Sequence, residues 1–379
     1  MGVILIMDLK ELMIVSEQEL EELNKSIDRI NQEKSRINFN RNILESLIGR
    51  IEKVIPYREE SEIRTITPIR YSEMLKFVMD FYKSIDEEIY QKVEKYVFQQ
   101  EKGVNLYIYN PYKIDKEKLD SKTGIEYSGV TIEGYDWCEI HIPLTQQVNF
   151  LRNKKNIELD NIIPEATLHD AYVMVHEIGH VLDFNIDQMR LGKANEGKKG
   201  VTRQLLTEST ALAFEKMFSK YLLKNKTFSK EIVQAIDSIR ENLIREDCCA
   251  TYYKLMLYKE KEKNGQITEE FLEKVMRDNN LSKGELKKII RAVINDKNKV
   301  WYQEKYAIAK LIAPSIAKKY EEGDILAIKK YLQSTQEGNL KDALLAIGIE
   351  NNKEGIEILF KNLQEEEMLS REQDEKIEK

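Results

Sequence analysis

The chain is poor in cysteine and has no long apolar run. It has 3 cysteines among 379 residues, and Cys248 and Cys249 are adjacent. The odd count and this spacing argue against a disulfide framework, so we expect a reduced, cytoplasmic protein. The opening stretch MGVILIM is too short to span a bilayer and lacks the features of a secretory signal. We therefore expect no membrane segment.

An excess of basic charge is also missing. The net charge is −7, from 59 basic and 66 acidic residues that are mixed along the chain. No basic stripe dominates any segment, which argues against a nucleic-acid surface. The 6 prolines and 16 glycines form no linker and no phosphate-binding loop of the Walker type. A charged fraction of 33% favours a fold of long, solvated helices.

Helical periodicity prevails over most of the chain. Residues 8–55 predict one long helix or a helical hairpin, because apolar residues recur at alternating spacings of three and four. Two alternatives stay open for this apolar stripe. It packs on the rest of the chain, which we favour, or it binds a protein partner as a coiled coil. Residues 72–102 and the chain after Pro164 are also helical by pattern, with breaks near 192–200, 264–268, 279–284 and 335–340.

Strands are expected only in residues 103–145. The stretches VNLYIYN and CEIHIPLT are rich in β-branched and aromatic residues, and turn residues lie between them. We predict one small antiparallel sheet here and a mainly α fold overall.

One short stretch, YVMVHEIGHVLDF, suggests metal chemistry. His176 and His180 are four residues apart, so a helix places both imidazoles on one face, where they can bind one zinc ion. Glu177 lies about 100° round the helix from His176, and it can reach a metal-bound water as general base. Zinc lowers the pKa of such a water toward about 7.

A catalytic zinc needs a third protein ligand and one open position. No third histidine follows the motif closely, so a glutamate from a second helix is the remaining common solution. Glu208 fits, because the helical stretch QLLTESTALAFEKMF surrounds it with apolar positions. Glu215, two turns further on, and Asp183 are candidates to accept hydrogen bonds from the ligating imidazoles.

These residues resemble a known family. HEIGH, a 27-residue spacer, then a glutamate with a second glutamate seven residues on, resembles the thimet oligopeptidase and oligoendopeptidase F family of zinc peptidases. The stretches MLKFVMDFYKSIDEEIYQKVEKY and WYQEKYAIAKLIAPSIAKKYEEGD also resemble segments of that family, as does the closing unit IKKYLQSTQEGNLKDALLAIGIENNKEGIEILFKNLQEE. The resemblance covers roughly residues 70–367. It is closest to the oligoendopeptidase F branch, with a shortened N-terminal region.

The resemblance implies a helical zincin-like fold with a deep channel. It also implies that the protein hydrolyses short peptides. Residues 1–66 would form an N-terminal helical segment and residues 67–379 the catalytic domain. One zinc ion would be held by His176, His180 and Glu208. Residues 138–144 would supply an edge strand that pairs with the peptide substrate. The resemblance implies further site residues. Glu139, His141 and Ile142 would bind the substrate. Tyr302 and Tyr306 would donate hydrogen bonds to the oxyanion.

The chain also departs from the family pattern. Residues 291–307 hold no histidine where the family has one, and Glu304 occupies a tyrosine-like position. Loss of one oxyanion donor can cost about 10²–10³ in rate. Two alternatives to an efficient peptidase therefore stay open. One is a zinc protein that binds peptide with little turnover, and the other is a protease for one partner recognised through the 8–55 helix.

Overall fold

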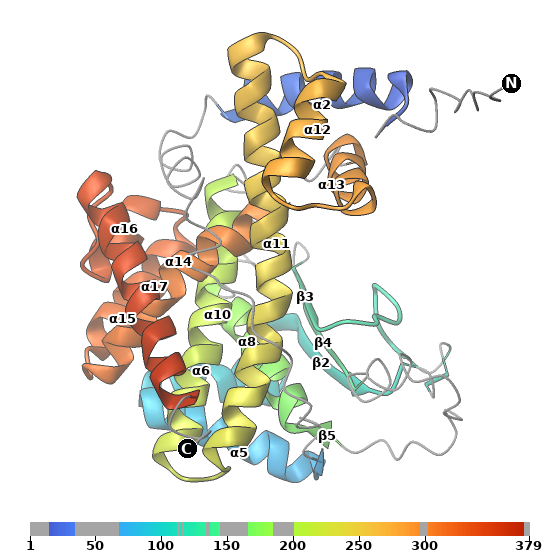
Figure 1. The fold of residues 1–379 in the computed structure, drawn as a ribbon. Coiled ribbons are helices and arrows are strands. Elements are labelled where there is room, and N and C mark those ends of the chain that lie inside the picture. The colour runs from blue at the N-terminus through green and yellow to red at the C-terminus, as the bar shows by residue number, and fades with distance from the viewer. Residues whose placement is uncertain are drawn as a thin grey trace, which may run out of the picture. The chain divides into compact units, whose positions relative to one another are not determined.

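A computed structural model describes residues 15–34, 68–111, 114–115, 117, 119–133, 137–144, 166–184, 201–295 and 302–374. Helices dominate these residues, which confirms the prediction of a mainly α chain (Figure 1). The chain divides into two compact units. The first comprises Met1–Pro56 with Arg245–Ala307, and the second Tyr57–Ile244 with Ile308–Lys379. The predicted division at residues 66 and 67 stays a prediction.

In the first unit, the described part of the N-terminal segment packs on its own chain. It forms helix α2 (Glu17–Lys34), beside α12 (Glu269–Asp278), α13 (Lys283–Asn295) and the second half of α11 (Lys230–Asn264). Leu23 and Ile27 are fully buried. Asn24 donates to the carbonyl of Ile267 at 3.2 Å and accepts from its N–H at 2.8 Å. This is the packing we favoured, and binding of a partner through the rest of residues 8–55 stays a prediction.

The second unit holds the remaining helices. Near its start lie α5 (Tyr71–Ile85), α6 (Glu87–Val93), the π-helical turn η1 (Glu94–Phe98) and the short η2 (Glu101–Gly103). Two long helices follow, α8 (Leu168–Asp183) and α10 (Val201–Lys224). The closing part has α14 (Tyr302–Glu321), α15 (Ile325–Gln336), α16 (Leu340–Ala346) and α17 (Lys353–Asp374), of which α14 begins in the first unit. The predicted breaks at 264–268, 279–284 and 335–340 are confirmed, and 192–200 lies outside the described residues.

Helix α8 is the centre of the second unit. Thr167 and Asp170 start it with a reciprocal cap, in which the Asp170 N–H donates to Thr167 Oγ1 and the Thr167 N–H to Asp170 Oδ2. Every residue of the helix is buried. It packs along α10, its neighbour in Figure 1, and also contacts α5 and the sheet. Tyr82 of α5 donates to the carbonyl of Val175 at 3.0 Å, which fixes the backbone just before the motif.

The strands form two small sheets. Strands β1 (Pro68–Ile69) and β5 (Ala166–Thr167) pair as antiparallel neighbours. Strands β2 (Val104–Tyr109), β3 (Val130–Glu133) and β4 (Cys138–Pro143) form the second sheet in the order β2-β4-β3, and this sheet contacts α8. The prediction of a purely antiparallel sheet is wrong, because β2 and β4 are parallel. Strand β3 begins opposite His141 and runs back antiparallel to β4, so β4 starts again beside Val104, the first residue of β2, and runs in the same direction as β2.

The predicted edge strand is a middle strand. Strand β4 is hydrogen-bonded to β2 on one side and to β3 on the other. The side chains of Glu139, His141 and Ile142 are completely buried. The prediction that residues 138–144 offer an open edge to a peptide is therefore wrong. Among the described residues, β3 has only β4 as a neighbour, and its second side is an edge.

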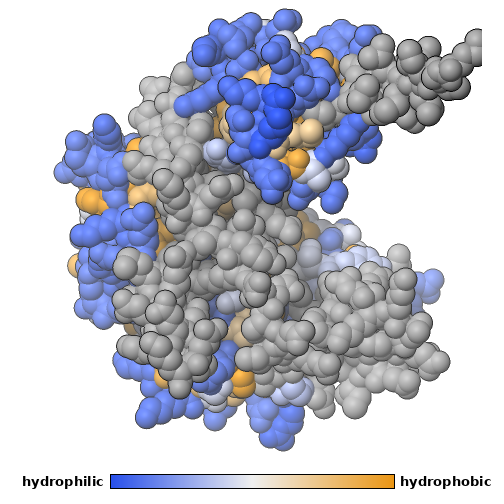
Figure 2. All heavy atoms as spheres, viewed as in Figure 1, coloured by the Kyte–Doolittle hydropathy of each residue, from blue (hydrophilic) through white to orange (hydrophobic). Residues whose placement is uncertain are grey.

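None of the helices in the described part of the chain is long and apolar enough to cross a membrane. On the face shown in Figure 2, hydrophilic side chains prevail over the described residues, and hydrophobic ones show through only in small areas.

Candidate metal centre

Three predicted ligands come together from two helices. Helix α8 carries His176 and His180, and α10 carries Glu208. The two Nε2 atoms are 3.1 Å apart. Glu208 Oε2 lies 3.5 Å from His176 Nε2 and 3.8 Å from His180 Nε2. All three residues are buried, and within the described ranges they are the group of histidine, cysteine and acidic side chains that could hold a metal ion.

The spacing of these three atoms matches one small ion. Zinc bonds of about 2.0–2.1 Å in a tetrahedral arrangement separate neighbouring ligand atoms by about 3.3–3.4 Å. The three observed separations, 3.1, 3.5 and 3.8 Å, lie on either side of that value. Two imidazoles and one carboxylate are also a ligand set that zinc accepts in catalytic sites. The residues therefore fit a metal ion of this type.

His176 is oriented from behind by a carboxylate and a guanidinium. Its Nδ1 donates to Glu215 Oε1 at 2.5 Å, which leaves Nε2 facing Glu208. Arg240 of α11 then holds Glu215 with two hydrogen bonds, from Nε to Oε2 at 2.7 Å and from Nη2 to Oε1. The contact between Glu215 and His176 was expected from the sequence, but Arg240 was not. It lies 25 residues after Glu215, and no local pattern connects the two.

Charge in this centre favours a cation between the ligands. Burial alone would lower the pKa of His176, but hydrogen bonds to Glu208 and Glu215 raise it to about 10. Burial would raise the pKa of Glu215, yet Arg240 and His176 hold it at about 2. With Glu177 ionised, three carboxylates face the Arg240 guanidinium and the protonated His176. A divalent cation that displaces the His176 proton would bring the net charge of these groups to zero.

Glu177 contacts the sheet. Thr131 of β3 donates through Oγ1 to Glu177 Oε2 at 2.7 Å and to its main-chain carbonyl at 3.1 Å. A Cβ atom at Gly129 would lie 3.0 Å from Glu177 Oε1 and 2.4 Å from Val173 Cγ1, so any side chain there would displace Val173. Burial raises the pKa of Glu177 to about 7, against the opposing effects of His176 and Thr131. A carboxylate with that pKa is suited to proton transfer near neutral pH. Gly129 and Thr131 were missed from the sequence.

Asp183 contacts helix α10. Its Oδ1 accepts from Thr210 Oγ1 at 3.3 Å, two residues after Glu208 on α10. The adjacent Ser209 shares a hydrogen bond of 2.6 Å with the hydroxyl of Tyr331. These contacts hold the α10 segment that carries Glu208, and a direct role of Asp183 toward an imidazole stays a prediction.

Gly179 lets the two ligand-bearing helices approach closely. A Cβ atom at this position would lie 2.8 Å from the Cα of Ala211. The absence of a side chain at Gly179, within the motif, thus brings α10 up to α8.

Tyr302 and Tyr306 lie at the start of α14, in the first unit, whereas the three candidate ligands belong to the second. Their oxyanion role stays a prediction.

Comparison with known proteins gives little beyond this geometry. No protein-family profile matches the chain, and no curated protein sequence matches it. Among solved structures, a candidate oligoendopeptidase F from Bacillus anthracis str. Ames is similar, with a TM-score of 0.45 and 13% identity. The likeness covers 88% of this chain and 55% of that one, so the chain spans about half the length of that protein.

Proposed function

We propose that the chain is a zinc-dependent peptidase that hydrolyses short peptides. The observation that carries this proposal is the convergence of His176 Nε2, His180 Nε2 and Glu208 Oε2 at the mutual separations of zinc ligands, beside a buried Glu177. His176, His180 and Glu208 would hold the ion. A bound zinc ion supplies Lewis-acid polarisation of the scissile carbonyl and acidifies a water.

Glu177 is the proposed general base. Thr131 holds its Oε2, which leaves Oε1, on the side of Gly129, as the oxygen that takes the proton from the attacking water. The same oxygen would return that proton to the leaving amine. Tyr302 or Tyr306 is the proposed donor to the oxyanion, on the sequence argument alone.

The open edge of β3 is the proposed peptide-binding edge, in place of β4. Thr131 lies on β3 and contacts Glu177, so a peptide paired along β3 would run past the general base. Pairing of this kind uses main-chain hydrogen bonds. We therefore expect loose sequence preference among substrates.

The test is cleavage of a mixed quenched-fluorescent peptide library by the zinc-loaded protein, with two matched variants. We expect Glu177→Gln to keep its zinc, measured by elemental analysis, and to lose cleavage, because the amide cannot take a proton. We expect Glu208→Gln to lose zinc as well. Cleavage by Glu177→Gln at the wild-type rate would refute the mechanism. A wild-type protein that binds zinc and peptide but releases no product would instead favour the peptide-binding alternative.

A further inference from the structure

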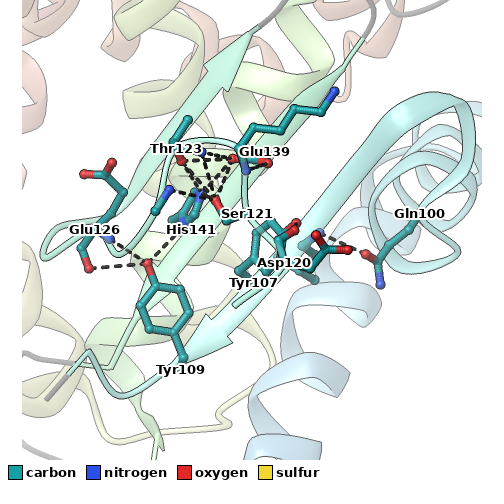
Figure 3. Close-up of polar contacts among 12 residues, drawn as sticks. Gln100, Tyr107, Tyr109, Asp120, Ser121, Thr123, Glu126, Glu139 and His141 are labelled. Carbon is teal, nitrogen blue, oxygen red and sulfur yellow. Dashed lines mark hydrogen bonds and ion pairs between the residues drawn. The ribbon is translucent and has the colours of Figure 1, made fainter. Parts of the chain in front are cut away.

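The outer face of β4 carries a second cluster of buried polar groups, apart from the candidate metal centre (Figure 3). Side chains alternate along a strand, so Glu139 and His141 share one face, while Ile140 lies on the other. Ile140 pairs with Thr131, whose side chain contacts Glu177 of α8. Glu139 and His141 therefore point away from α8. Both are completely buried, under the turn at residues 121–123.

Glu139 binds that turn through both carboxylate oxygens. Oε1 accepts from the N–H of Lys122 at 2.8 Å. Oε2 accepts from Ser121 Oγ at 2.8 Å and from Thr123 Oγ1 at 2.9 Å. Burial would raise the pKa of Glu139, but these hydrogen bonds outweigh it and the pKa is lowered. The carboxylate thus stays ionised and holds three consecutive residues of the turn.

His141 extends the same network to the end of the loop. Its Nδ1 shares a hydrogen bond of 2.9 Å with the hydroxyl of Tyr109, and that hydroxyl accepts from the N–H of Glu126 at 2.8 Å. Its Nε2 faces Thr123 Oγ1 at 3.1 Å and Glu139 Oε2 at 3.3 Å. Glu139 and the aliphatic hydroxyl of Thr123 thus face the same ring nitrogen. A hydrolytic Ser-His-acid relay needs them on opposite nitrogens, so this cluster is not a second nucleophilic site.

The segment held by this cluster leads directly to Glu177. Glu126 is anchored through Tyr109, and five residues later Thr131 donates to the Glu177 carboxylate. Between them, Gly129 lies in close contact with Val173 and Glu177. We propose that Glu139 and His141 are positioning residues, which fix the 121–129 loop on the sheet and thereby set β3 and Thr131 against Glu177. This inference rests on the proposed peptidase function for its catalytic consequence.

The structural part is tested by hydrogen–deuterium exchange on the full chain. The variants are Glu139→Gln and His141→Phe, which keep side-chain shape but remove the carboxylate charge or the ring nitrogens. The matched control is Asp86→Asn, because Asp86 also accepts from two main-chain N–H groups, those of Glu88 and Ile89, at the start of α6. We expect the amide exchange rate in residues 119–133 to rise by about tenfold or more in both variants, because this segment would open locally more often. In the control the rate should stay unchanged. Wild-type protection of residues 130–133 in both variants would overturn the proposal, whether or not the protein cleaves peptides.

The catalytic part is tested on a peptide that the zinc-loaded wild type cleaves. We expect both variants to lower kcat by up to about 10²-fold with zinc content unchanged, because small misplacements of a catalytic group have effects of this size. Asp86→Asn should keep the wild-type kcat. Faster exchange with an unchanged kcat would show that the two residues only anchor a turn, which refutes the positioning role. Failure of the wild type to bind zinc or cleave any peptide would refute the proposed function, while the exchange result would still decide whether the cluster holds β3.

Discussion

At the scale of single residues, Arg240 is the side chain that connects the candidate metal centre to α11. Arg240 donates hydrogen bonds to both carboxylate oxygens of Glu215, and Glu215 in turn accepts from His176 Nδ1 at 2.5 Å. A ligating histidine depends on such a partner for its tautomer and ring orientation. The fork of the guanidinium fixes the carboxylate plane, which a lysine ammonium cannot do.

We therefore predict that Arg240→Met weakens zinc binding by about 10–100-fold, the range seen when outer partners of a metal site are removed. The zinc affinity of Arg240→Lys should lie between that of Arg240→Met and that of the wild type. The control is Lys216→Met on α10, because Lys216 pairs at 2.8 Å with Glu366 of α17, which is not one of the three ligands. The measurement is competition with a chromophoric chelator. Wild-type affinity in Arg240→Met would mean that Glu215 needs no such support.

At the scale of elements, the centre depends on how closely α8 and α10 pack. His176 and His180 lie on one helix and Glu208 on the other, so the distance between the helices sets the distance between the ligands. Gly179 lies where the two helices come close together, and its missing Cβ leaves room for the backbone of Ala211. The motif therefore contributes a helix contact as well as ligands.

Gly179→Ala should destabilise the second unit and weaken its metal site. The added Cβ would meet a backbone atom 2.8 Å away, and backbone cannot move aside as a flexible side chain can. Overpacking of this kind costs about 1–3 kcal/mol. The matched control is Gly284→Ala in α13, where an added Cβ meets only Ser282 Oγ, at 4.0 Å. Thermal unfolding and zinc affinity, measured together, check the prediction. An unchanged melting temperature and zinc affinity in Gly179→Ala would contradict it.

At the scale of the whole molecule, all three candidate ligands belong to the second compact unit. A zinc ion held between α8 and α10 would bind the folded unit and not the unfolded chain. An ion at 100 times its dissociation constant then adds about 2.7 kcal/mol to the free energy of unfolding.

Addition of zinc to the metal-free protein should therefore raise the melting temperature, and a chelator should lower it again. Differential scanning calorimetry of wild type and Glu208→Gln is the measurement. Glu208→Gln should lose most of the zinc-induced rise in melting temperature, because it lacks the charge of one ligand. An equal shift in both proteins would place the bound zinc somewhere else.

Local features were predictable from sequence where the physics is local. The four-residue spacing of His176 and His180 is enough to put both rings on one helix face. The caps and loop residues between α11, α12 and α13 likewise mark breaks that the structure confirms. Glu208 was predictable from its apolar neighbours in a helical stretch and from the spacing typical of a known family, whereas nothing local brings α10 to α8.

The amino-acid sequence alone thus determined a mainly helical chain with His176, Glu177 and His180 together on one helix, because helical periodicity acts within a few residues. The tertiary structure alone decided that β4 is a middle strand, that Thr131 and Gly129 contact Glu177, and that Arg240 supports Glu215. Strand order and contacts between distant residues depend on how the loops close and on which faces are buried. Residues 25 or more positions apart meet for that reason, and no short pattern in the sequence records it.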